Sequence, residues 1–309
     1  MFHRSGILSC ALLFLISCAR VQGLPPEEVL TRSARATRDL QSALFSAQAL
    51  FDTGSGIEGG MRGEIRADGR IQHAGGQLQF SFTASGVGDD ARQAWDMKGD
   101  VIVAAEQEIY VQLHELTGQL PQALIPAERL DGLLGRWWML PVKGKQSSSL
   151  VTPDPELLQM QAEVVDVTRD RGILTLQGRQ TYHYDTMINR DKLIRFLEGV
   201  ARERTEPADP AQAQAFTERL DASGELWIDT DTFFVRALRW MITSKDITRP
   251  FSVEFRLDLG DFNAADPIEP PADVLPLPED SLSVLSNFAV GSHPAGTSES
   301  QVTVPVLVP

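Results

Sequence analysis

The chain has 309 residues, of which 42% are hydrophobic and 23% charged, and its formal net charge is −14. This length is enough to bury one large core or two small ones. The excess of acidic residues argues against binding to nucleic acid, and against docking on anionic lipid head groups through charge. It fits simple solubility equally well.

The N-terminus has the pattern of an export signal. His3 and Arg4 precede a short apolar run over residues 6–16, which ends in Leu15-Ile16-Ser17-Cys18. The run is too short for a membrane-spanning helix, which needs about 20 residues. A cysteine directly after the small residue resembles the lipobox of bacterial lipoproteins. That resemblance implies cleavage after residue 17 and a new N-terminal Cys18 that carries acyl chains such as palmitate. An ordinary secretory signal that contains a cysteine is the alternative.

Removal of residues 1–17 leaves 292 residues, Cys18–Pro309. Cys10 would be lost with the signal, so we expect no disulfide and no cysteine-based metal site. The remaining histidines are scattered and show no metal-binding spacing, and no nucleotide-binding motif is present. The sequence therefore predicts neither a metal nor a cofactor. The four histidines beyond the signal are His73, His114, His183 and His293.

In chain order, residues 18–26 resemble a tether, and Pro25-Pro26-Glu27-Glu28 begins a helix that continues to about residue 44. Proline and acidic residues both suit a first helical turn. Further helices are expected over 153–161, from Asn189 onward and over 211–220. The predicted strands are 46–51, 61–66, 77–84, 93–104, 108–113, 137–140, 163–168, 172–177, 179–188, 223–229, 233–244 and 251–262.

The strands alternate in a way that buries one face of a sheet. Leu78, Phe80 and Phe82, for example, are separated by polar residues. This order of elements predicts an α+β fold, with one large curved antiparallel sheet, an incomplete β-barrel, covered by helices. We place this domain at residues 27–272 and a Pro/Ser-rich disordered tail at 273–309.

One short motif suggests catalysis. Phe51-Asp52-Thr53-Gly54-Ser55 resembles the active-site loop of aspartic peptidases, which need two such carboxylates. The other candidate, Asp229-Thr230-Asp231, lacks the glycine. A turn at a strand end accounts for Asp52-Thr53-Gly54 more simply. We therefore predict no catalytic residue and retain an aspartic-type peptidase only as a remote alternative.

Aromatic residues in the predicted strands are the candidates for a ligand cavity. They either form a packed core or line an apolar pocket between the sheet and the helices. The candidates are Phe80, Phe82, Trp95, Trp137, Trp138, Trp227 and Trp240.

Several segments together resemble the superfamily of LolA-like proteins, which includes the lipid-carrying lipoproteins of mycobacteria. These segments include Glu108-Ile109-Tyr110-Val111-Gln112-Leu113, Gly224-Glu225-Leu226-Trp227-Ile228-Asp229 and Gly260-Asp261-Phe262-Asn263. The resemblance implies an incomplete antiparallel barrel with an apolar cavity that binds acyl chains, or a sensor that binds other proteins. It supplies no catalytic residue.

The sequence thus predicts a non-enzymatic bacterial lipoprotein of the cell envelope. It would be anchored to a membrane through Cys18 and would bind a lipid or a lipoprotein acyl chain. A protein-interaction or sensor module with a filled core, docking a partner in the envelope, is the alternative. Ala19 follows the cysteine, which by the sorting logic of the family favours the outer membrane where a cell has two membranes.

Overall fold

The computed structural model describes residues 23–54, 60–73, 76–88, 94–104, 108–118, 132–140, 164–203, 214–215, 217–246 and 250–277. The helices with defined bounds in this part are α1 (Pro26–Arg38) and α3 (Arg190–Glu203). The strands are β1 (Ser42–Asp52), β2 (Met61–Gln72), β3 (Gln77–Gly88), β4 (Ala94–Val103), β5 (Ile109–Gly118), β6 (Trp137–Leu140), β7 (Val165–Leu176), β8 (Arg179–Ile188), β9 (Leu220–Asp229), β10 (Val235–Ser244), β11 (Ser252–Gly260) and β12 (Val274–Pro276).

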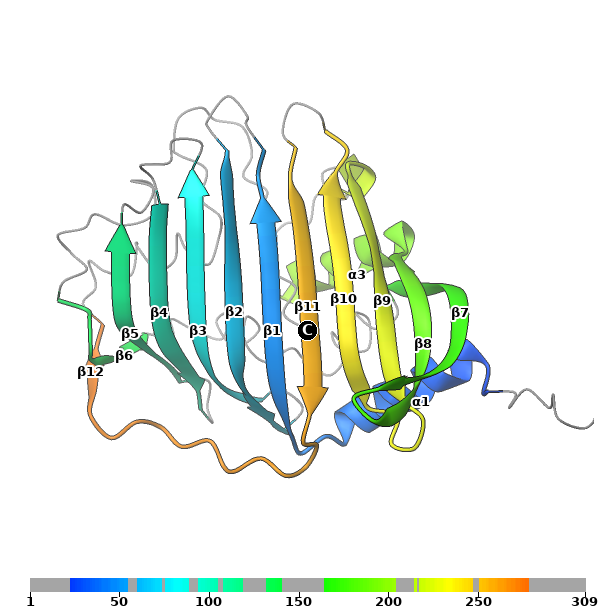
Figure 1. The fold of residues 1–309 in the computed structure, drawn as a ribbon, viewed down its shortest axis with the longest axis horizontal. Coiled ribbons are helices and arrows are strands. Elements are labelled where there is room, and N and C mark those ends of the chain that lie inside the picture. The colour runs from blue at the N-terminus through cyan, green and yellow to red at the C-terminus, as the bar shows by residue number, and fades with distance from the viewer. Residues whose placement is uncertain are drawn as a thin grey trace, which may run out of the picture.

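All twelve strands form one open, curved sheet (Figure 1). Their order is β12-β6-β5-β4-β3-β2-β1-β11-β10-β9-β8-β7. Neighbouring strands are antiparallel, except that β12 pairs with β6 in parallel. The pairing of β1 with β11 joins the early strands to the late strands, so the sheet is continuous across its middle.

The predicted α+β class is wrong, although the open curved sheet agrees with expectation. The described part of the chain is mostly strand, and its two helices do not cover the sheet. Each helix offers only a narrow apolar stripe. Helix α1 buries Val29 and Ser33, and α3 buries Leu193 and Phe196. The apolar surface of such a helix can pack against two or three strands, but it cannot cover the face of a twelve-stranded sheet. The expected helix over 153–161 lies outside the described residues, and in the expected helix over 211–220 the described residues 214–215 and 217–218 are helical.

Both helices pack at the β7–β9 end of the sheet. Val29 of α1 contacts a cluster that includes Tyr184 and Ile228, all fully buried. Helix α3 begins at Arg190, directly after the predicted cap Asn189, whose side-chain Oδ1 accepts a hydrogen bond from the backbone N–H of Lys192 at 3.1 Å. In Figure 1, α3 lies behind this part of the sheet.

The segment after β11 runs along one end of the strands to β12 (Figure 1). Gln72 of β2 holds it through two hydrogen bonds, to the carbonyl of Asp266 at 2.6 Å and from the N–H of Ile268 at 3.1 Å. Ile268 is buried with Ile102 and Tyr110. The sheet therefore takes in residues 274–276, which fall within the range predicted as tail. The rest of that range, from residue 278, lies outside the described residues.

No helix in the described ranges combines the length and apolar character needed to span a membrane.

Candidate functional site: the apolar face of the sheet

The two faces of the sheet differ sharply in chemistry. In antiparallel pairs, residues directly opposite one another share a face. On β1, every second residue from Ala43 to Phe51 points to one face of the sheet. The residues paired with them across the neighbouring strands, from β5 to β9, are all apolar or glycine. We call this side the apolar face. The row through Gln48 lies on the opposite, polar face and includes Arg66, Arg256 and Glu225.

The two ends of the apolar face are buried. At the β8–β9 end, Tyr184, Leu226 and Ile228 lie beneath α1. At the β4–β5 end, Trp95, Met97 and Leu113 form a second buried cluster. Partly buried residues of the middle strands, Phe51 of β1, Met61 of β2 and Phe82 of β3, pack against the second cluster.

Side chains in the middle of the apolar face are half-buried or exposed. Ile65 is 40% exposed, although it lies at the centre of the sheet. We call this region the apolar trough. Strand β1 contributes small alanines to this region, and β3, β10 and β11 contribute aromatic rings. The residues of the trough are Phe45, Ala47, Ala49, Ile65, Ala67, Phe80, Phe82, Trp240, Val253 and Phe255.

Glycines opposite the aromatic residues make this arrangement possible. Phe51, Phe80, Phe82, Trp95 and Trp240 each lie directly across from a glycine on the neighbouring strand. A Cβ on that glycine would come within 2.4–2.9 Å of the aromatic side chain in every case. The aromatic side chains therefore occupy space beside the strands that a glycine leaves free. The glycines in these pairs are Gly63, Gly69, Gly99, Gly86 and Gly224, respectively.

The predicted cavity residues separate into two groups. Phe80, Phe82 and Trp240 line the trough, and Trp95 belongs to the buried cluster at its end. Trp138 also lies on the apolar face, where its Nε1 donates to the carbonyl of Leu133 at 2.9 Å.

Trp137 and Trp227 lie on the polar face and are not brought together with the others. Trp137 packs beside Tyr110 and Ile268, beneath the segment that leads to β12. Trp227 stacks on His183 with ring centroids 4.4 Å apart. The alternation within β6 and β9 determines these positions, because neighbouring residues on a strand point to opposite faces.

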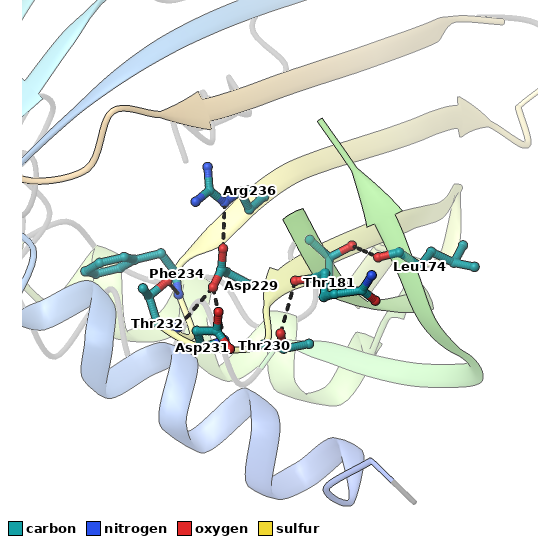
Figure 2. Close-up of polar contacts among 9 residues, drawn as sticks. Leu174, Thr181, Asp229, Thr230, Asp231, Thr232, Phe234 and Arg236 are labelled. Carbon is teal, nitrogen blue, oxygen red and sulfur yellow. Dashed lines mark hydrogen bonds and ion pairs between the residues drawn. The ribbon is translucent and has the colours of Figure 1, made fainter. Parts of the chain in front are cut away.

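Asp229 closes the turn between β9 and β10 (Figure 2). Its Oδ1 accepts hydrogen bonds from the N–H groups of Asp231 and Thr232, both at 3.0 Å, and its Oδ2 accepts from Nε of Arg236 at 3.0 Å. Burial raises the pKa of Asp229, but these two backbone N–H groups and Arg236 outweigh it and leave the pKa lowered. Asp229 is therefore an anionic anchor of this turn.

Asp52 has a similar local role. Strand β1 ends at this residue, and its Oδ1 accepts a hydrogen bond from the N–H of Gly54 at 2.7 Å. Gly54 has a positive φ of 61°, as a turn glycine allows. The Asp-Thr-Gly motif is thus a strand-end turn, as the simpler interpretation predicted. Cys18 lies outside the described residues.

No protein-family model and no curated protein sequence matches the chain. Solved structures similar to it include the lipoprotein LppX of Mycobacterium tuberculosis, at 15% identity and a TM-score of 0.40, covering 79% of this chain and 100% of that one. LprF of Mycobacterium bovis shows 16% identity and a TM-score of 0.39, with coverages of 80% and 98%. A LolA superfamily protein of Nitrosomonas europaea shows 7% identity and a TM-score of 0.23, with coverages of 83% and 96%.

These structures are of the kinds that the sequence resemblance named, mycobacterial lipoproteins and a LolA superfamily protein.

Proposed function

We propose that this protein is an exported lipoprotein that holds an acyl chain of a lipid or of another lipoprotein in the apolar trough. The observation that carries the proposal is the half-exposed strip of alanine and aromatic side chains across the middle strands. Soluble proteins rarely leave a contiguous apolar surface of this kind open unless it binds something.

The trough suits a long hydrocarbon chain better than a compact polar molecule. It combines the small side chains of Ala47, Ala49 and Ala67 with the aromatic rings of Phe80, Phe82 and Phe255. Each buried CH2 group contributes about 0.8 kcal/mol, so one acyl chain gains useful affinity without polar contacts. Binding in this form needs no covalent chemistry.

Anchoring through Cys18 complements this proposal. A protein that binds acyl chains works beside a membrane, and two or more acyl groups on the N-terminal cysteine would hold it there. The folded body would face away from the cytoplasm in the cell envelope.

A filling mutation in the trough tests the proposal. Ala47→Phe places a ring between Ala67 and Leu257, where an acyl chain would lie. We expect it to weaken binding of a fluorescent long-chain fatty acid at least 10-fold, measured by titration. Ser46→Phe is the matched control, because Ser46 is the neighbouring residue on the polar face and is exposed.

The two variants separate the trough from general surface hydrophobicity. Equal loss of binding in both, or no loss in Ala47→Phe, would contradict the proposal. Native mass spectrometry of the gently purified wild-type protein supplies a second measurement. A bound mass that disappears on delipidation supports an acyl ligand, whereas a clean apo mass favours the protein-interaction module.

A further inference from the structure

A second cluster of functional groups lies on the polar face, away from the trough. His183 and Asp185 are on β8 and Glu225 is on β9. Asp185 lies directly opposite Glu225, and His183 lies opposite Trp227. One ligand atom from each of His183, Asp185 and Glu225 comes within 4.8 Å of the other two.

His183 is buried without a hydrogen-bond partner. The residue is 4% exposed, and neither ring nitrogen forms a hydrogen bond. A buried imidazole must place at least one N–H and one lone pair somewhere, and leaving both unpaired costs free energy. Such an orphaned group needs an explanation.

The spacing of the nearest donors fits a metal ion. Nε2 of His183 lies 3.5 Å from Oε2 of Glu225, which is longer than an ordinary N–H···O hydrogen bond. Two ligand atoms about 2.0–2.2 Å from one tetrahedral zinc ion are about 3.3–3.6 Å apart. The 3.5 Å distance between Nε2 of His183 and Oε2 of Glu225 therefore matches the distance between two ligand atoms of one zinc ion.

Neighbouring side chains hold the ligands in place. Arg171 contacts Oδ1 of Asp185 at 2.7 Å and Oε1 of Glu225 at 3.6 Å, while Oε2 of Glu225 faces the histidine. The ring of Trp227 stacks on His183 at an interplanar angle of 13°. The guanidinium carbon of Arg239 lies 5.0 Å from the centroid of the same Trp227 ring. Such outer contacts orient the ligands of metal sites.

We propose that His183, Asp185 and Glu225 bind a single divalent zinc ion. Nε2 of the histidine supplies the nitrogen ligand, and the carboxylates supply two oxygen ligands. Asp185 swings inward from its present position, and a water molecule completes the tetrahedron. Arg171 stays as the outer contact that orients both carboxylates. The site joins β8 to β9 and is independent of the trough.

Zinc titration of the purified full-length protein, after treatment with a chelator, tests the proposal. We expect one zinc ion per chain by equilibrium dialysis, together with a rise in Tm, because a ligand that binds only the folded state stabilises it.

His183→Phe removes both nitrogens and keeps an aromatic ring to stack on Trp227, so it preserves packing. We expect this variant and Glu225→Gln to lose at least 100-fold in zinc affinity. His114→Phe is the matched control, because His114 is exposed and pairs with Asp100 at 2.7 Å. Circular dichroism would confirm that each variant folds.

Three results of the zinc titrations would overturn the proposal. Absence of zinc binding by the wild type overturns it, as does equal zinc binding by wild type and His183→Phe. Loss of binding in His114→Phe alone would place the ion elsewhere and overturn it too. The acyl-binding titration is a separate measurement, so failure of one proposal leaves the other open to its own test.

Discussion

At the scale of single residues, Asp229 and Arg236 form the most deeply buried ion pair in the described part of the chain. Their side chains are 2% and 13% exposed. Breaking such a pair leaves one charge buried without compensation, which costs far more than losing a surface ion pair. The guanidinium of Arg236 also lies 4.8 Å from the centroid of the Phe262 ring, so the pair ties the β9–β10 turn to the residues that follow β11.

We expect Asp229→Asn to lower the free energy of unfolding by about 3 kcal/mol at pH 7, because Arg236 loses its buried partner. The folded-state pKa of Asp229 is lowered, so its contribution is complete above about pH 4–5 and is lost as the pH falls through that pKa. The difference from wild type should therefore shrink in acid. Urea unfolding at pH 7 and pH 3 measures both effects.

Asp231→Asn is the control for this prediction, since Asp231 is exposed in the same turn. Its free energy of unfolding should stay within about 0.5 kcal/mol of wild type. If Asp229→Asn were equally mild, the ion pair would not be a source of stability.

At the scale of elements, the pairing of aromatic residues with glycines shapes the apolar face. Glycine inside a strand normally weakens it, because glycine has no side chain to pack and loses more backbone entropy. Here the aromatic side chain opposite each glycine supplies the missing contact. Gly224 shows this clearly, since a Cβ there would lie 2.3 Å from the carbonyl oxygen of Arg239 and 2.9 Å from Cδ2 of Trp240.

Gly224→Ala should destabilise the protein by about 1–3 kcal/mol, because the added methyl group displaces either the β10 backbone or the Trp240 ring. It should also weaken acyl binding by pushing that ring into the trough. Gly260→Ala is the control, because nothing lies within 4 Å of a Cβ at that position. Urea unfolding and the fatty-acid titration measure the two effects, and equal stability of the two variants would contradict the pairing.

Sequence patterns located these strands well where alternation was strict. The bounds of β6 and β8 were predicted to the residue, and the start of α3 followed from its asparagine cap. Strands β1, β2, β3 and β5 extend beyond prediction, because glycine and alanine positions weaken the alternation signal. In β2, for example, the predicted strand ended at Arg66, but pairing with β1 and β3 continues to Gln72.

At the scale of the whole molecule, register carries information that spacing along the chain does not. The aromatic candidates were chosen because they fall in strands, yet only pairing across the sheet determines that Trp240 and Trp227 lie on opposite faces. The cluster around His183 was missed for the same reason. Glu225 lies 40 residues after Asp185 in the sequence, and the two meet only because β8 pairs with β9. Helix coverage was overestimated because amphipathic patterns do not reveal which face a helix packs on.

The whole molecule also has to reach its ligand, and Cys18 is the residue that would hold it at a membrane. A single acyl chain binds membranes only marginally, so stable attachment requires the several chains that a lipoprotein cysteine carries. We expect the wild-type protein to fractionate with membranes and Cys18→Ala to appear in the soluble exported fraction. Cys10→Ala is the matched control, because Cys10 lies within the predicted signal and should not affect anchoring. If Cys18→Ala stayed with the membranes, attachment would depend on another part of the chain, and the apolar trough would be the first surface to test.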